Sequence, residues 1–218
     1  MKLTKFPQSC ILLEDAKVKI LIDPGVIGVT EEILAKWKNP DYIFVTHKHS
    51  DHFDEESVKK IVSNKTKIYS TKEVAEFYPN TTFQIVKVGD KVKAGEIAVE
   101  IVKAIHGYTP LLKGPKEVKD ATGLILNLEK KRIYHTGDTI CFKNEIKCDV
   151  ILLPFNNHGV CMSPFESALF ANETGATLTI PIHYDNAKLP GDIEKMKAEL
   201  ERKGINYKFL KSEESIEL

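Results

Sequence analysis

The sequence predicts an α/β fold in which helices cover β-sheets. Apolar runs of strand length outnumber helical patterns, and helical patterns occur in both halves of the chain. No low-complexity linker or internal repeat divides the 218 residues. We therefore expect one domain that spans residues 1–218.

Strands are expected where apolar runs end at turn residues. A first hairpin closes at Asp23-Pro24-Gly25, and a second turns at Glu129-Lys130-Lys131. The predicted strands are Cys10–Glu14, Val18–Ile22, Tyr42–Thr46, Lys67–Ser70, Phe83–Val88, Glu96–Ile105, Gly123–Leu128, Arg132–His135, Val150–Leu153, Leu178–Ile180 and Tyr207–Leu210.

Helices are expected where apolar residues recur at helical spacing behind a capping residue. Thr30 is an N-cap, and Ser163 with Glu166 forms a capping box that has Pro164 at the first helical position. The predicted helices are Glu31–Lys38, Asp54–Ser63, Lys72–Phe77, Pro164–Gly175 and Asp192–Lys203. Gly107–Asp120, rich in glycine, proline and lysine, is predicted to be a mobile loop.

Composition excludes several classes of partner. Hydrophobic residues make up 42% of the chain and charged residues 28%, and the 31 basic residues balance the 31 acidic ones. Because the chain carries no net charge, no long-range electrostatic attraction draws it to nucleic acid or to a membrane. We therefore expect neither as a partner. The N-terminal residues have no continuous apolar region, so we expect no signal peptide, and no stretch of 18 apolar residues predicts a membrane span. The four scattered cysteines have no metal-ligand spacing. These features predict a cytoplasmic protein.

The stretch His47-Lys48-His49-Ser50-Asp51-His52 predicts a metal site. The chain has seven histidines, and three of them fall in these six residues, directly after a buried strand. Imidazole nitrogen and carboxylate oxygen are the usual ligands of zinc and neighbouring divalent ions. His47 and His49 can aim their rings to one side of an extended turn. Asp51 and His52 can then face an adjacent position.

Three later residues favour the same site. His106 and His183 each follow an apolar strand, and Asp138 lies in a glycine-flanked turn after another strand. Strand ends at one edge of a sheet are where α/β proteins place their sites.

With these motifs the sequence resembles the metallo-β-lactamase superfamily, from about residue 9 to residue 190. Its size and its His135-Thr136-Gly137-Asp138-Thr139 segment are most similar to the small L-ascorbate-6-phosphate lactonase-like branch. The resemblance implies a four-layered αβ/βα sandwich. It also implies His47, His49 and His106 on one metal ion, Asp51, His52 and His183 on a second, and Asp138 between them. Asp23 would orient a ligand histidine.

The resemblance predicts a hydrolase that uses two divalent ions, with zinc as the first choice and manganese, iron or nickel as alternatives. Such a pair supplies hydroxide near neutral pH, which would cleave an ester, a lactone or a phosphodiester. Asp51 is the candidate proton acceptor, His158 a candidate acid or anion contact, and Tyr184 a candidate oxyanion donor. Asn156-Asn157-His158 replaces the glycines that relatives often have there, which affects the expected pocket shape.

The substrate is expected to be a small molecule, and an anionic one if Lys113, Lys116 and Lys119 cover the site. His135 has two open interpretations, a structural residue or part of the site. Competing functions are a mononuclear-iron persulfide dioxygenase-like oxidoreductase, a ribonuclease Z-like nuclease and a metal-binding protein without activity. A homo-oligomer is left open.

Overall fold

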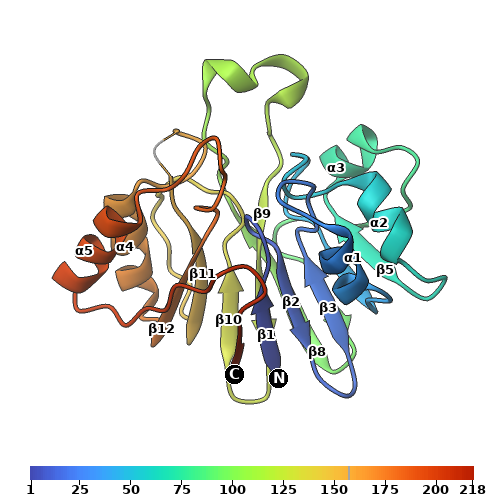
Figure 1. Ribbon diagram of the computed structural model, residues 1–218, viewed down its shortest axis with the longest axis horizontal. Coiled ribbons are helices and arrows are strands. Elements are labelled where there is room, and N and C mark those ends of the chain that lie inside the picture. Colours follow the sequence, from blue (N-terminus) through green and yellow to red (C-terminus); the bar gives the residue numbers. More distant parts are fainter. Residues whose placement is uncertain (157) are drawn as a thin grey trace.

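Two mixed β-sheets pack face to face in the computed structural model, which describes residues 1–156 and 158–218 (Figure 1). The first contains β1 (Lys2–Lys5), β2 (Ile11–Glu14), β3 (Lys19–Ile22), β4 (Tyr42–Phe44), β5 (Lys67–Ser70), β6 (Gln84–Ile85) and β13 (Ser215–Glu217). The second contains β7 (Lys91–Ala94), β8 (Ile97–Lys103), β9 (Thr122–Asn127), β10 (Arg132–His135), β11 (Val150–Pro154) and β12 (Leu178–Ile182). The strand orders are β13-β1-β2-β3-β4-β5-β6 and β12-β11-β10-β9-β8-β7.

Helices cover the outer face of each sheet. On the first sheet lie α1 (Glu31–Trp37), α2 (Glu55–Ile61) and α3 (Lys72–Phe77), and on the second lie α4 (Pro164–Thr174) and α5 (Ile193–Arg202) (Figure 1). The four layers are thus helices, sheet, sheet and helices. This confirms the predicted α/β class and the αβ/βα sandwich.

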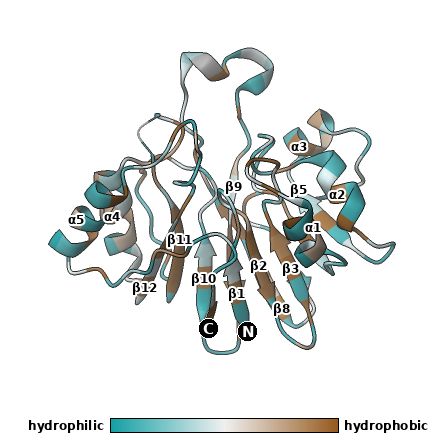
Figure 2. Ribbon diagram, in the orientation of Figure 1, coloured by the Kyte–Doolittle hydropathy of each residue, from teal (hydrophilic) through white to brown (hydrophobic). Residues whose placement is uncertain are grey.

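Successive side chains of a strand point to opposite faces of its sheet, and this alternation produces three apolar cores. In β3, Ile20 and Ile22 point between the sheets, whereas Leu21 packs beneath the helices of the first sheet. In β11, Leu152 points between the sheets and Leu153 packs against the other helical layer. A strand with apolar residues on both faces is typical of a sheet that is buried on both sides. Figure 2 shows this as brown strands between teal-faced helices.

Parallel pairing brings the polar strand ends together. β3, β4 and β5 run parallel, and so do β10, β11 and β12. β8 is antiparallel to β9, and β9 is antiparallel to β10, so β8 also ends at the same edge as β10. The loops after these strands therefore meet at one edge of the sandwich, as expected for α/β sites.

Several strand predictions were wrong in extent. β1, β7 and β13 were not predicted, because β7 and β13 are short edge strands with partly exposed side chains and β1 is a short run broken by lysines. The predicted strand Phe83–Val88 is reduced to β6. Tyr207–Leu210 is not a strand, although Tyr207 forms an isolated bridge with Thr179. Gly107–Asp120 contains two 3₁₀ turns, Pro110–Leu112 and Gly114–Lys116.

No helix in the described ranges combines the length and the apolar composition that crossing a bilayer requires.

The Asp23-Pro24-Gly25 turn packs directly on the histidine-rich loop. Val26 N–H donates to Ser50 O at 2.8 Å, and Asp54 N–H donates to Pro24 O at 3.1 Å. A Cβ on Gly25 would lie 2.0 Å from the carbonyl oxygen of Asp51. Glycine is therefore required by this close backbone approach.

We predict that Gly25→Ala lowers the unfolding free energy by about 3 kcal/mol or more, at the upper end of overpacking penalties, because backbone must move. The control is Gly204→Ala, which has a φ of +67° but no neighbour within 4 Å. It should cost only about 1–2 kcal/mol for the left-handed backbone. Urea unfolding measures both, and equal losses would contradict the packing argument.

Candidate metal centre

Loops from both sheets bring the seven predicted ligands together. His47, His49, Asp51 and His52 follow β4, His106 follows β8, Asp138 follows β10 and His183 follows β12. Their donor atoms form three groups, and within each group all the atoms lie within 4.8 Å of one another. The groups are His47 with His49 and His106, His47 with His52 and Asp138, and Asp51 with His52 and His183.

A buried carboxylate orients the first ligand loop. Asp23, which is 0% exposed, accepts hydrogen bonds from Thr46 N–H, Thr46 Oγ1 and His52 Nδ1, each at 2.8 Å. The bond to His52 Nδ1 directs the other ring nitrogen, Nε2, toward Asp138 Oδ1 at 3.5 Å. Asp23 therefore holds the tautomer and ring direction that a ligand histidine needs.

The first donor group has its outer ring nitrogens engaged by backbone oxygens. His49 Nε2 lies 2.8 Å from Lys116 O, and His106 Nδ1 lies 2.7 Å from Gly107 O. Because a backbone carbonyl only accepts, both nitrogens donate, which leaves His49 Nδ1 and His106 Nε2 as lone pairs. His49 Nδ1 lies 3.2 Å from His47 Nε2. Thr46 Oγ1 donates to Asp23, so it accepts from His47 Nδ1 at 3.2 Å, which leaves His47 Nε2 as a third lone pair. Three imidazole lone pairs thus converge, which suits a cation.

The second donor group mixes imidazoles with carboxylates. His183 Nε2 lies 3.1 Å from Asp51 Oδ2 and 3.2 Å from Asp138 Oδ2. Asp138 also joins His47 and His52 in a donor group whose atoms lie within 4.8 Å of one another, so it is within reach of one ligand from each set. This is the position expected of a bridging carboxylate.

Unsatisfied atoms test whether a metal fits. In the described part of the chain, His52 Nε2, His106 Nε2 and Asp138 Oδ1 are buried side-chain atoms without a hydrogen-bond partner. Burying polar atoms without partners is costly, and native proteins rarely do so. Since all three belong to the donor groups and have the chemistry of zinc ligands, these residues fit divalent cations.

The charges of the site also indicate that it needs a cation. Burial alone would lower the pKa of His52, but the carboxylates of Asp138, Asp23 and Asp51 outweigh it and raise that pKa to about 10. Asp138 and Asp51 likewise outweigh burial at His183, where the pKa lies well above its ordinary value. Without a metal ion, protons on these two histidines compensate the carboxylates. A bound cation would replace them.

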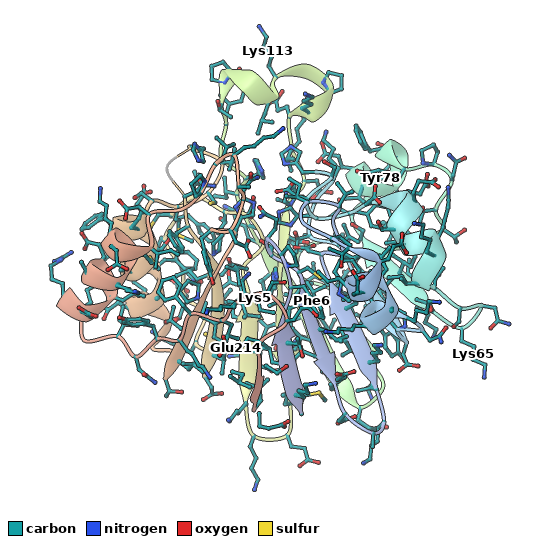
Figure 3. All side chains as sticks on the ribbon, viewed as in Figure 1. Lys5, Phe6, Lys65, Tyr78, Lys113 and Glu214 are labelled. Atoms are coloured by element: carbon teal, nitrogen blue, oxygen red, sulfur yellow. The ribbon has the colours of Figure 1, made fainter. Side chains whose placement is uncertain are left out.

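An ion pair between the buried Lys5 and the partly exposed Asp185 supports the strained backbone of His183, which has a φ of +59°. The fully buried Lys5 donates from Nζ to Asp185 Oδ2 at 2.6 Å, and Asp185 Oδ1 accepts from Gln8 N–H at 2.8 Å. His183 N–H in turn donates to Gln8 O at 3.0 Å. Figure 3 places Lys5 near the middle of the molecule. This network ties the ligand's turn to β1.

His135 has a structural position. Its Nε2 donates to Ser9 O at 2.9 Å, and its Nδ1 accepts from Gly137 N–H at 3.2 Å. Both ring nitrogens are therefore occupied, and the second bond holds the turn that carries Asp138.

A cavity of about 470 Å³ opens beside the ligands. His158 contributes to its wall together with Asp51, Asp138 and His183, and His158 Nε2 is buried without a hydrogen-bond partner among the described residues. Asn157, which the sequence analysis named beside it, lies outside the described residues. Sequence reasoning missed two other wall residues, Phe77 and Tyr78, because aromatic residues at the end of a helix carry no site signal.

Tyr184 is a correction to the predicted site. Its hydroxyl donates to Leu210 O at 2.7 Å, and its ring stacks on Phe155 at a centroid distance of 5.5 Å. The residue is buried within the core beneath α4 and α5. The hydroxyl is therefore bonded within the core and does not face the cavity, and we remove Tyr184 from the candidate catalytic residues.

Comparisons with known proteins agree with this arrangement. The family model of the beta-lactamase superfamily domain matches residues 2–183. A UPF0173 metal-dependent hydrolase from Korarchaeum cryptofilum is 31% identical over 231 positions, with 100% of both chains covered. A similarly named protein from Nanoarchaeum equitans is 30% identical over 228 positions, again with 100% of both chains covered.

Solved structures share the fold. Igni18 from Ignicoccus hospitalis, described as a metallo hydrolase, has a TM-score of 0.77 at 25% identity, covering 99% of this chain and 97% of that one. An isothiocyanate hydrolase from gut bacteria of Delia radicum has a TM-score of 0.75 at 20% identity, covering 100% and 99%. The second likeness concerns the fold alone. The chain therefore belongs to the metallo-β-lactamase superfamily, within the family of UPF0173 metal-dependent hydrolases.

Proposed function

We propose that the chain binds two divalent cations and hydrolyses an ester, lactone or phosphodiester bond in a small molecule. The observation that carries this is the pair of donor groups, His47 with His49 and His106, and Asp51 with His52 and His183. Asp138 joins His47 of the first group and His52 of the second in a third set of donor atoms that lie within 4.8 Å of one another. Zinc suits this nitrogen-rich set best. The likeness to the ascorbate-6-phosphate lactonase-like branch favours the lactone and phosphate-ester part of this range.

When bound, such cations would lower the pKa of a water molecule and polarise the substrate's oxygen. The chain's own groups would then hold and move protons. Asp51 has an oxygen, Oδ2, 3.1 Å from His183 Nε2, at the side of the ligands that faces the cavity. Charges on His52 and His183 outweigh burial and lower the pKa of Asp51, so it stays a carboxylate that can accept a proton from water.

His158 is proposed as the proton donor to the leaving group. It lies in the cavity wall, and its Nε2 is buried without a hydrogen-bond partner in the described structure. Its backbone N–H donates to Asn156 Oδ1 at 2.9 Å, which fixes the base of the side chain. An imidazole at this position can give a proton to an alkoxide as the bond breaks.

An anionic substrate group would meet fewer lysines than the sequence predicted. Of the three loop lysines, Lys116 contributes to the cavity wall. Lys113 points away from the molecule at the tip of the loop (Figure 3), and the backbone of Lys119 donates to Glu73. Of these three lysines, the preference for an anion therefore depends on Lys116, and it stays a prediction. Lys48 also lines the cavity, but its ammonium group pairs with Glu73.

For the metal ligands, we predict that Asp51→Ala and His183→Ala each reduce bound zinc from two ions to about one per chain. The rate of hydrolysis should fall at least about 100-fold, because the second metal ion and the proton acceptor are both needed for the reaction. Elemental analysis measures the zinc content, and an assay with a phosphodiester or a lactone measures the rate of hydrolysis. Glu129→Ala, in an exposed turn, is the control. A variant with full zinc content and full rate would sink the proposal.

Zinc binding should release protons. At pH 7 the metal-free protein holds protons on His52, with a pKa of about 10, and on His183, with its raised pKa. Ligand histidines must lose these protons, so zinc affinity should rise with pH. Calorimetric titration at pH 7 in two buffers of different ionisation enthalpy should show heats that differ by the released protons. Zinc-loaded protein is the control. Heats that do not depend on the buffer would contradict the release of protons from His52 and His183.

The role of His158 is tested with two leaving groups. His158→Gln should slow hydrolysis of an alkyl ester about 100-fold, because its alkoxide needs a proton. The same variant should change hydrolysis of the matching p-nitrophenyl ester little, because p-nitrophenolate leaves unprotonated. Zinc content should stay at the wild-type level. Equal losses on both esters would instead show that His158 does not protonate the leaving group.

A further inference from the structure

We propose that the cavity takes a substrate with an apolar body, of about the size of a medium-length acyl chain or a single aromatic ring. The inference rests on the proposed function for the position of the scissile bond, which would lie at Asp51 and His183. The apolar class itself is argued from the cavity walls.

Part of the cavity wall consists of exposed apolar side chains. Phe77 and Leu189 are 45% and 49% exposed, and both contribute to the cavity. Neither belongs to the three apolar cores, although the Phe77 ring meets Tyr78 edge-on at a centroid distance of 5.0 Å. Large apolar side chains that gather at a cavity mark a surface for an apolar ligand. Leu112 and Pro115 of the loop after His106 extend the same wall.

Two polar groups of the cavity wall near Phe77 are already engaged. The Tyr78 hydroxyl donates to Lys48 O at 2.9 Å and to Phe53 O at 3.2 Å. Lys48 Nζ pairs with Glu73 Oε1 at 2.9 Å and lies 5.6 Å from the centroid of the Phe77 ring. The phenol ring and the neutralised ammonium group therefore leave an apolar surface toward the ligand. A strongly polar substrate would lose water here without gaining partners.

Polar residues of the cavity wall can fix the scissile group. Asn156, Asn186 and His158 line the cavity together with Asp138 and His183. Amide and imidazole groups suit hydrogen bonds to a carbonyl or phosphoryl group. A wall that contains both these polar groups and apolar residues suits an amphipathic substrate. A cavity of about 470 Å³ has room for a small organic molecule.

The test separates the substrate class from the reaction. Binding of octanoate and acetate to zinc-loaded protein, measured by calorimetry, tests the class without any turnover. Both ligands carry one carboxylate, so the ratio of their affinities measures how much the alkyl chain of octanoate contributes to binding. We expect octanoate to bind at least tenfold more tightly. Phe77→Ala and Leu189→Ala should each reduce this ratio at least threefold. Phe165→Ala removes a side chain that is 48% exposed on α4, outside the cavity, and should leave it unchanged.

Hydrolysis of p-nitrophenyl octanoate and p-nitrophenyl acetate is then measured on the same samples. Equal affinity for octanoate and acetate, or a ratio that Phe77→Ala and Leu189→Ala leave intact, would overturn the apolar class even if both esters are cleaved. A preference for octanoate without cleavage of any ester, lactone or phosphodiester would support the class and overturn the proposed function. Faster turnover of the octanoyl ester supports both.

Discussion

The hydrogen bonds to Asp23 are the contacts on which the metal centre depends. One fully buried carboxylate binds the backbone and hydroxyl of Thr46 and the Nδ1 of His52. It thereby fixes the end of β4, where the ligand loop begins, and the ring nitrogen that His52 presents to Asp138. The close approach of Gly25 to Asp51 locks the same loop from the opposite side. Loss of either contact would move several ligands at once, because they share one loop.

The sandwich supplies the remaining ligands from its second sheet. β8, β10 and β12 each end at the edge where β4 ends, and each is followed by one ligand. The Lys5–Asp185 pair and Gln8 connect the His183 turn to β1, so a contact between the sheets sets the distance between the two halves of the centre. The pKa values of Asp51 and Asp138 stay low despite burial because charged histidines face these carboxylates. Divalent cations meet this requirement better than protons on histidine, which is why the geometry and the charges favour the same ligand.

The sequence was enough to predict the fold class and the side chains that the structure gathers at one edge of the sheets, and too little to predict how other side chains are used. The seven candidate ligands could be found because five of them are histidines, a scarce residue type in this chain, and all seven lie in loops that follow apolar strands. Tyr184 could not be assigned, because only the packing shows that its hydroxyl binds Leu210 O. The burial of Lys5 could not be predicted either, since its partner Asp185 lies 180 residues away. The short β7 and β13 were missed because edge strands with polar, partly exposed residues resemble loops.

The most direct test of the account is a crystal structure of the zinc-loaded protein, with diffraction data collected above and below the zinc absorption edge. The account predicts two anomalous peaks. One should lie among His47, His49 and His106 and the other among Asp51, His52 and His183, with Asp138 in contact with both. A single peak, or peaks outside these two donor groups, would contradict it.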